Sequence, residues 1–129
     1  MSKKTSELGK RGEAFAEEHL SRNGFRVIAS NCTTKYGEID IVAMEDDVIC
    51  FIEVKTRTSD AAGRPEEAVT LSKKCKIART ARKFLLEKRC YGRPCRFDVV
   101  AIIMPYDGEP SVEVFKNAFT LDEIGMRWV

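Results

Sequence analysis

Residues 37–57 decide the fold class, and they read GEIDIVAMEDDVICFIEVKTR. Two runs rich in Ile, Val and Phe, residues 37–44 and 48–56, enclose the acidic triplet at 45–47. Runs of this composition are typical of strands, and aspartates are typical of the turns that join them. We therefore expect two long antiparallel strands that are joined as a hairpin.

The sequence on either side of this hairpin predicts two helices and three further strands. Before the hairpin, apolar residues recur at helical spacing between Ser6, which can cap a helix, and Asn23, which precedes a glycine and can end one. A second helical pattern follows the hairpin, begins at Pro65 and is interrupted near residues 70–72. The expected elements are a helix over 6–23, strands over 25–29, 37–44 and 48–56, a loop over 60–64, a helix over 65–89, a strand over 96–103, a turn over 106–110, a strand over 111–116, and a short helix from residue 121. The order α-β-β-β-α-β-β predicts one domain over residues 1–129, with an α/β fold in which helices flank a mixed sheet.

The composition is that of a folded protein. Hydrophobic residues make up 43% and charged residues 33% of the 129 residues, which excludes a disordered chain. No apolar run approaches the roughly 20 residues that span a bilayer, so we expect no membrane as a partner. The first six residues carry two lysines and lead into no apolar segment, so we expect a cytoplasmic protein without a secretory signal. The five cysteines, odd in number and without C-x-x-C spacing, indicate reduced thiols rather than a disulfide framework or a zinc site.

Positive charge is concentrated in one segment, residues 73–96. It holds ten basic residues and one acid, a net charge of +9, whereas the rest of the chain holds 12 basic and 19 acidic residues, a net charge of −7. A basic segment on an otherwise acidic protein indicates a polyanionic partner such as nucleic acid, and a solvated helix face is the alternative. The residues expected to contact phosphate are Lys73, Lys74, Lys76, Arg79, Arg82 and Lys83.

Three charged residues, Asp40, Glu53 and Lys55, stand inside the apolar strands of the hairpin. Residues two apart on a strand share a face, so Glu53 and Lys55 point the same way as the apolar Ile49 and Phe51. Alternation in the first strand predicts one face made of Ile39, Ile41 and Ala43 and another made of Glu38, Asp40, Val42 and Met44. Charges are rarely buried in strands without a partner or a metal, which favours a functional site. The alternatives are a structural ion pair between Glu53 and Lys55 and a solvent-facing sheet surface.

These residue types suit a magnesium-dependent nuclease. The carboxylates of Asp40 and Glu53 supply hard oxygen ligands for Mg²⁺ or Mn²⁺, and the backbone carbonyl of Val54 can add a third. Such a metal stabilises charge on a scissile phosphate and lowers the pKa of a bound water. Lys55 can orient or deprotonate that water, or offset charge in the transition state, and the sequence leaves these roles open.

The spacing of the site residues also resembles a known motif. Asp40, followed after twelve residues by Glu53-Val54-Lys55, resembles the PD-(D/E)xK nuclease signature, with Ile39 in place of the proline. More closely, the chain resembles the bacterial YraN-type family of uncharacterised, endonuclease-like proteins. The segments that carry this resemblance are GKRGEA at 9–14, GEID at 37–40, FIEVKTR at 51–57 and RFDVV at 96–100. The resemblance implies a restriction-endonuclease-like fold with an α-β-β-β-α-β core and a metal-dependent endonuclease that hydrolyses DNA.

That family is in turn similar to archaeal Holliday junction resolvases, which add a glutamate on the first helix. The matching residue is Glu13, which joins Asp40, Glu53 and Lys55 as a catalytic candidate; the alternative is an ordinary exposed glutamate. The similarity implies branched or junction DNA as substrate, and paired cuts by a chain with one site need a two-fold homodimer. The apolar C-terminal residues either form its interface or close the chain's own core: Phe115, Phe119, Met126, Trp128 and Val129.

Four other polar residues allow two interpretations each. Glu38 shares a predicted face with Asp40 and is either a further ligand or a residue at the start of the strand. Asp98 lies in an apolar strand, where a structural pair with a basic neighbour is favoured. His19, the single histidine, lies on the apolar stripe of the first helix, which favours a packed histidine over a catalytic base. Arg57 follows the catalytic strand and either holds a phosphate or is a solvated loop arginine.

Two further function classes remain open at the level of sequence. One is a nucleic-acid-binding or DNA-processing accessory factor with a vestigial nuclease site. The other is an interaction protein whose basic helix contacts a partner protein or RNA. An intact set of Asp40, Glu53 and Lys55 favours the endonuclease over the accessory factor. The one-sided charge of residues 73–96 favours both of these over the interaction protein.

Overall fold

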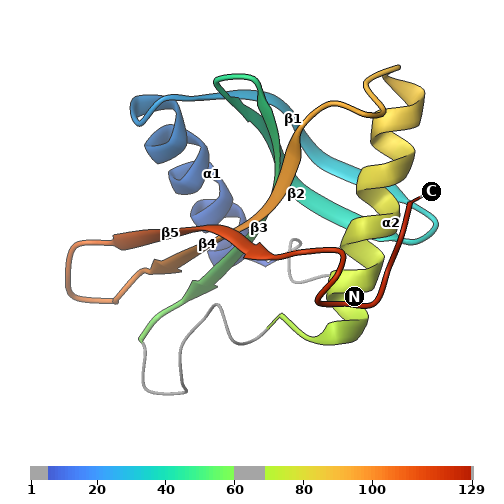
Figure 1. Ribbon diagram of the computed structural model, residues 1–129. Coiled ribbons are helices and arrows are strands. Elements are labelled where there is room, and N and C mark those ends of the chain that lie inside the picture. Colours follow the sequence, from blue (N-terminus) through green and yellow to red (C-terminus); the bar gives the residue numbers. More distant parts are fainter. Residues whose placement is uncertain (1–5, 60–68, 129) are drawn as a thin grey trace.

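A five-stranded mixed sheet with a helix on each face makes up the fold (Figure 1). The computed structural model describes residues 6–59 and 69–128. The elements are α1 (Glu7–Arg22), β1 (Phe25–Thr34), β2 (Gly37–Glu45), β3 (Val48–Arg57), α2 (Leu71–Glu87), β4 (Cys95–Ile103) and β5 (Ser111–Phe119). The predicted element order and the α/β fold class are confirmed, with β5 added to the α-β-β-β-α-β core.

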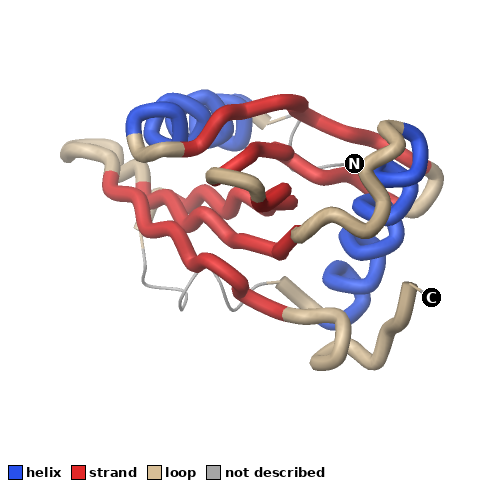
Figure 2. The backbone as a smooth tube through the Cα atoms, turned by 45° about the horizontal axis from the view of Figure 1, so that its top comes forward, coloured by secondary structure: helices blue, strands red, loops and turns tan. Residues whose placement is uncertain are grey.

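The strands lie in the sheet in their chain order, β1-β2-β3-β4-β5. Figure 2 shows the strands of this sheet together with the helices. Neighbouring strands are antiparallel except for β3 and β4, which are parallel. A parallel pair needs a long crossover, and α2 lies in the connection between its two strands. The central strand β3 is therefore enclosed by neighbours on both sides, which suits its apolar sequence.

Two hydrophobic clusters occupy the two faces of the sheet. Side chains of β3 alternate between them, so Phe51 packs on the α2 side and Ile52 on the α1 side. The α2 side is closed by Ile77, Ala78, Ala81 and Leu85 of the helix, and the α1 side by Ala16 and Leu20. A residue of β3 thus faces one helix or the other according to whether its number is odd or even.

Helix α1 is capped and packed as its sequence predicts. The hydroxyl of Ser6 accepts a hydrogen bond from the Gly9 N–H at 2.9 Å, and Asn23 ends the helix ahead of Gly24, whose φ is 91°. The helix crosses β3 closely at Gly12, where an added Cβ would lie 1.9 Å from the Thr56 Oγ1. Only glycine permits this approach, so Gly12 determines how closely α1 packs on β3.

Several expected elements differ in the structure, and β5, expected over 111–116, extends to Phe119. Strand β1 extends to Thr34 rather than ending at residue 29. The sequence does not predict its second half because β1 is an edge strand, and the polar residues there carry no apolar pattern. Helix α2 begins at Leu71, with Thr70 as its cap; the expected loop at 60–64 and the helix start at Pro65 lie outside the described residues. The helix expected from Leu121 is wrong, since residues 121–125 form turns that end at Gly125, whose φ is 71°.

The apolar C-terminal residues pack on the chain's own core. Phe119 is buried and stacks on Phe97 with ring centroids 4.8 Å apart, and Trp128 contacts Phe97 edge-on at 6.1 Å. The Tyr91 hydroxyl donates a hydrogen bond to the carbonyl oxygen of Trp128 at 2.8 Å. These residues therefore do not form an exposed patch, and Val129 lies outside the described residues.

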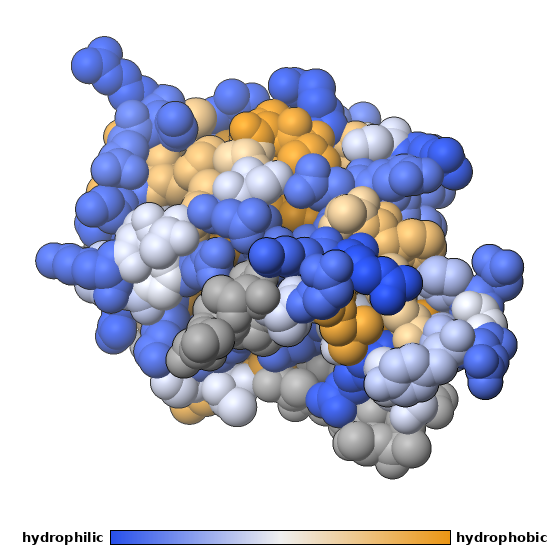
Figure 3. Space-filling model, turned by 180° about the vertical axis from the view of Figure 1, so that it is seen from behind, coloured by the Kyte–Doolittle hydropathy of each residue, from blue (hydrophilic) through white to orange (hydrophobic). Residues whose placement is uncertain are grey.

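The surface is mostly polar on the side opposite to the view of Figure 1. Figure 3 shows hydrophilic residues over most of this face, with apolar side chains gathered in its upper part. Neither α1 nor α2, the helices of the described ranges, is long and apolar enough to cross a bilayer.

Candidate active site

Asp40 lies where two strands of the sheet separate. The β2–β3 ladder runs from the turn only as far as the pair Ile41 and Ile52, whereas β2 stays paired with β1 to Gly37. Beyond Ile41 a side chain replaces the backbone as the hydrogen-bond partner of β3, since the Oδ2 of Asp40 accepts a hydrogen bond from the Val54 N–H at 2.7 Å. The carboxylate is completely buried and is fixed beside the backbone of β3.

This separation corrects the predicted faces of β2. Ile41 packs on the α1 side and Val42 on the α2 side, as strict alternation requires. Ile39 was expected to share the face of Ile41, but it packs with Val42 on the α2 side. The reason is that β2 is no longer paired with β3 before Ile41. The alternation of side chains in the paired part of the hairpin therefore does not fix the face of Ile39.

Glu53 faces α2 and is held by two lysines. Its Oε2 lies 2.7 Å from the Nζ of Lys73 on the first turn of α2, and 3.8 Å from the Nζ of Lys55 on its own strand. The Glu53 side chain is almost entirely buried, while the side chains of Lys55 and Lys73 are 15% and 31% exposed. The prediction that Glu53 and Lys55 share a face is confirmed.

The carboxylates of Asp40 and Glu53 fit a hard cation. One oxygen of each is held by the protein, and the other, Asp40 Oδ1 or Glu53 Oε1, is a buried atom that accepts no hydrogen bond within the described residues. Mg²⁺ typically takes one or two carboxylates and keeps several waters. In the described ranges no group of three or more His, Cys, Asp or Glu side chains is arranged to hold a metal.

Glu13 lies on the other side of β3 from Glu53. With Val54 and Thr56 it lines a small hollow of about 60 Å³ between α1 and the strand. Glu13 is half-buried, and it lies near β3 because Gly12, its neighbour in the chain, lets α1 approach the strand so closely. The structure thus brings Glu13 next to Val54, whose N–H holds Asp40, rather than to the carboxylate of Glu53.

The basic residues of α2 divide into two groups. Lys73 contacts Glu53 of β3, and the Nζ of Lys74 lies 5.5 Å from the centroid of the Phe119 ring of β5, so both contact residues of the sheet. We call the remaining four cations the basic face of α2: Lys76, Arg79, Arg82 and Lys83. Arg57, at the end of β3, is half-buried. It is an odd-numbered residue of the strand, as Glu53 is, so it belongs to the same face of the sheet.

Two open hollows lie along this basic face. The proximal hollow, about 580 Å³, lies between the β1–β2 turn and the start of α2, and its lining includes Lys35, Glu38, Lys73 and Lys76. The distal hollow, about 500 Å³, continues past the same turn along α2. Because Lys73 lines the proximal hollow and also contacts Glu53, this hollow leads to the candidate site. Glu38, considered above as a further ligand, lies on its wall.

Comparison with known proteins agrees with the resemblance noted in the sequence. The model of the uncharacterised protein family UPF0102 matches residues 12–102, a span that includes all four catalytic candidates. The chain belongs to this family. A UPF0102 protein of Clostridium tetani is 38% identical over 94% of this chain and 100% of its own length. Those of Symbiobacterium thermophilum and Lachnoclostridium phytofermentans are 41% and 42% identical over 87% and 92% of this chain, and over 95% and 96% of their own lengths.

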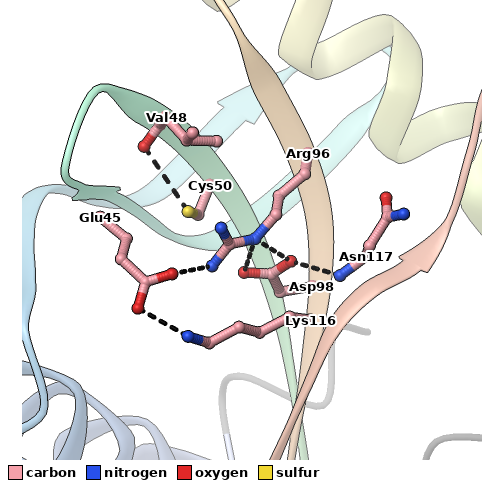
Figure 4. Close-up of polar contacts among 7 residues, drawn as sticks. All are labelled: Glu45, Val48, Cys50, Arg96, Asp98, Lys116 and Asn117. Atoms are coloured by element: carbon pink, nitrogen blue, oxygen red, sulfur yellow. Dashed lines mark hydrogen bonds and ion pairs between the residues drawn. The ribbon is translucent and has the colours of Figure 1, made fainter.

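This member of UPF0102 has a second charged cluster, which is structural (Figure 4). Asp98 is buried and accepts hydrogen bonds from the Arg96 Nε and the Asn117 backbone N–H, each at 2.9 Å. Glu45 accepts from Arg96 and Lys116, each at 2.6 Å, and these hydrogen bonds lower the pKa of Glu45. The predicted pairing of Asp98 with a basic neighbour is confirmed.

The single histidine and the cysteines are poor candidates for nucleophilic chemistry. His19 is half-buried on α1, which agrees with a packed histidine at the edge of the core. All five cysteines are free thiols, and burial, with the nearby charge of Asp98, raises the pKa of Cys50 to about 12. A thiol with so high a pKa stays protonated and unreactive at neutral pH.

Sequence reasoning did not find the contact between Lys73 and Glu53, nor the position of Lys35 and Tyr36. Lys73 was assigned to phosphate contact as one of many cations on a helix. Its partner lies 20 residues earlier in the chain, so only the packing of α2 on the sheet reveals the pair. The Lys35–Tyr36 turn carries no local motif, and its proximity to α2 is likewise a tertiary feature.

Proposed function

We propose that this chain is a metal-dependent endonuclease that hydrolyses DNA phosphodiester bonds, with Asp40, Glu53 and Lys55 as its active site. The observation that carries the proposal is the pair of buried carboxylates at the separation of β2 and β3, next to a lysine and an open cationic hollow. The UPF0102 relatives carry no named activity. The nuclease assignment therefore depends on the chemistry of these residues and on the PD-(D/E)xK resemblance.

Stability alone gives a poor account of these buried charges. Removing carboxylates from water costs several kcal/mol per ion, and apolar residues of similar volume stabilise a core equally well or better. Asp98 shows how this protein satisfies a structural carboxylate, with three hydrogen bonds from Arg96 and Asn117. Asp40 and Glu53 lie instead at the end of the β2–β3 ladder, with Lys55 and Lys73 beside Glu53 and an open hollow next to Lys73, which suits a ligand role.

Asp40 and Glu53 would hold Mg²⁺ or Mn²⁺, with the Val54 carbonyl as an additional ligand. A metal bound there supplies stabilisation of charge on the phosphate and a lowered pKa for its water. Lys55, held 3.8 Å from Glu53 Oε2, is placed to donate a hydrogen bond to a phosphate oxygen or to the attacking water. Lys73 and Arg57 add positive charge on the same side of the sheet, and Glu13 is proposed to assist from the α1 side.

Branched or junction DNA is the substrate class that the similarity to resolvases implies. Paired cuts across a junction would need a two-fold homodimer. Because the C-terminal apolar residues are used within the chain, we place its interface at a sheet edge, β1 or β5. Light scattering in the presence of a four-way junction would detect two protein copies per junction if this is correct.

A cleavage assay tests the proposed function. Labelled single strands, duplexes, forks, flaps and four-way junctions are incubated with the protein and Mg²⁺ or Mn²⁺. We expect cleavage of at least one of these DNAs, reduced by about 100-fold or more in Asp40→Asn, Glu53→Gln and Lys55→Met. Asp47→Asn, which removes an exposed acid at the β2–β3 turn, is the matched control and should cleave normally. Binding without cleavage of any of these DNAs would instead support an accessory factor with a vestigial site.

A further inference from the structure

The β1–β2 turn places an aromatic ring in the middle of the cationic hollows. Tyr36 lines both the proximal and the distal hollow, and its side chain is substantially exposed, with 38% relative accessibility. The Nζ of Lys35 lies 5.3 Å from the centroid of the Tyr36 ring. An exposed ring with cations on each side offers a flat apolar surface and fixed positive charge together.

The turn is held firmly against α2, so this ring has a defined position. Thr34 on β1 and Thr80 on α2 share a hydrogen bond between their hydroxyl groups at 3.1 Å, and Thr80 is completely buried. The hydroxyl of Thr34 also accepts the Tyr36 N–H at 3.1 Å. Gly37 passes so close to the helix that an added Cβ would lie 3.4 Å from the Lys76 Cβ. Figure 1 shows the turn between β1 and β2 beside α2.

The charges along these hollows have almost one sign. The proximal hollow has three cations and a single acid, Glu38, in its lining, and the lining of the distal hollow has four cations and no acid within the described ranges. The eleven residues of α2 from Lys73 to Lys83 span about 15 Å along the helix axis, which is the length of about four nucleotides of a stacked strand with a rise of about 3.4 Å each. The occupant that fits is therefore a short, repeating anion that also carries flat apolar groups.

We propose that the two hollows form a binding track for an unpaired DNA strand, in which Tyr36 stacks on a base and the basic face of α2 contacts the phosphates. Stacking on an aromatic side chain requires an exposed base, which a single strand offers and a duplex does not. The track begins at Lys73, next to Glu53, so it would lead one unpaired strand to the proposed active site. This inference deepens the proposed function and names a substrate feature, an unpaired segment of at least about four nucleotides.

The test measures binding in EDTA, so it does not depend on cleavage. Fluorescence anisotropy compares a labelled single-stranded oligonucleotide, its duplex, an RNA of the same sequence, and an abasic strand with the same number of phosphates. We expect Tyr36→Ala to weaken binding of the single strand by about fivefold or more and to change duplex and abasic-strand binding by less than twofold. Tyr36→Phe, which keeps the ring, should bind like the wild type. Tyr106→Ala, on the exposed β4–β5 turn, is the matched control and should also bind normally.

Equal binding of the single strand by Tyr36→Ala and the wild type would overturn the inference. An equal loss for the single strand and the abasic strand would overturn base stacking, and tighter binding of the RNA would overturn the assignment to DNA. Tyr36-dependent binding by a protein that cleaves nothing would support the track and reject the proposed function alone. Cleavage together with Tyr36-independent binding would reject the track alone.

Discussion

Replacing Lys73 by methionine should destabilise the protein and make its stability more dependent on a divalent cation. Lys73 lies 2.7 Å from the buried Glu53 carboxylate, closer than Lys55, and methionine keeps most of its apolar stem while removing the charge. Removing one partner of a fully buried pair costs about 3–5 kcal/mol. Lys73 is 31% exposed and Lys55 remains 3.8 Å from the same oxygen, so we expect a smaller loss of about 1–3 kcal/mol.

The assay is thermal and urea unfolding of the wild type and the Lys73→Met variant, in EDTA and then with Mn²⁺. For a domain of this size each kcal/mol lowers the Tm by about 4 °C, so the variant should melt about 4–12 °C lower in EDTA. A cation present at 100 times its Kd stabilises the folded state by about 2.7 kcal/mol. Mn²⁺ should raise the Tm of the variant more than that of the wild type, because Lys73 no longer competes with it for Glu53.

The matched control is Lys83→Met, which removes a cation of the same helix. The Lys83 side chain is 44% exposed and lies 4.0 Å from Glu87, so its loss should change stability by less than about 0.5 kcal/mol. The reasoning would be refuted if Lys73→Met unfolded like the wild type in EDTA. It would also be refuted if Mn²⁺ raised the Tm of both proteins by the same amount, because Lys73 would then have no part in the charge balance of the site.

Three further changes test the packing and the binding surface. Gly12→Ala should cost about 1–3 kcal/mol in urea unfolding, because its Cβ would overlap Thr56, and a second change of Thr56 to alanine should recover part of this loss. Asp98→Ala should lower stability by about 3–5 kcal/mol, since it leaves Arg96 with a partly uncompensated charge in the buried network; an unchanged Tm would contradict that role. Replacing three cations of the basic face by alanine should reduce the salt slope of single-strand binding by about 2, as each lost phosphate contact removes roughly 0.7.

Much of the fold could be predicted because its central strands carry strong local signals. The strands β2, β3 and β4 are buried, and their runs of Ile, Val and Phe are unmistakable in the sequence. The edge strand β1 was predicted only in part, because an edge exposes alternate residues and residues 30–34 are polar or small. At the C-terminus the apolar residues gave a helical pattern, but Gly125 ends the turn there and Trp128 packs on Phe97 instead.

The candidate site shows the same division between local and tertiary information. The common face of Glu53 and Lys55 follows from the period of two in a strand, and the hairpin brings Asp40 toward them. The displacement of Ile39 could not be predicted, because it depends on where the β2–β3 ladder stops. The contact of Lys73 with Glu53 depends on the packing of α2 across the sheet, which no pattern along the chain encodes.

The central claim, that Asp40 and Glu53 hold a divalent cation, is tested most directly by calorimetric titration with Mn²⁺. The titration is made on the wild type and on Asp40→Asn and Glu53→Gln, with a single-stranded oligonucleotide carrying uncleavable phosphorothioate linkages present to supply phosphate oxygens. The account predicts binding of one Mn²⁺ per chain to the wild type and its loss in both variants, each of which replaces a charged ligand by a neutral group of the same shape. Equal Mn²⁺ binding by the wild type and both variants would contradict the account.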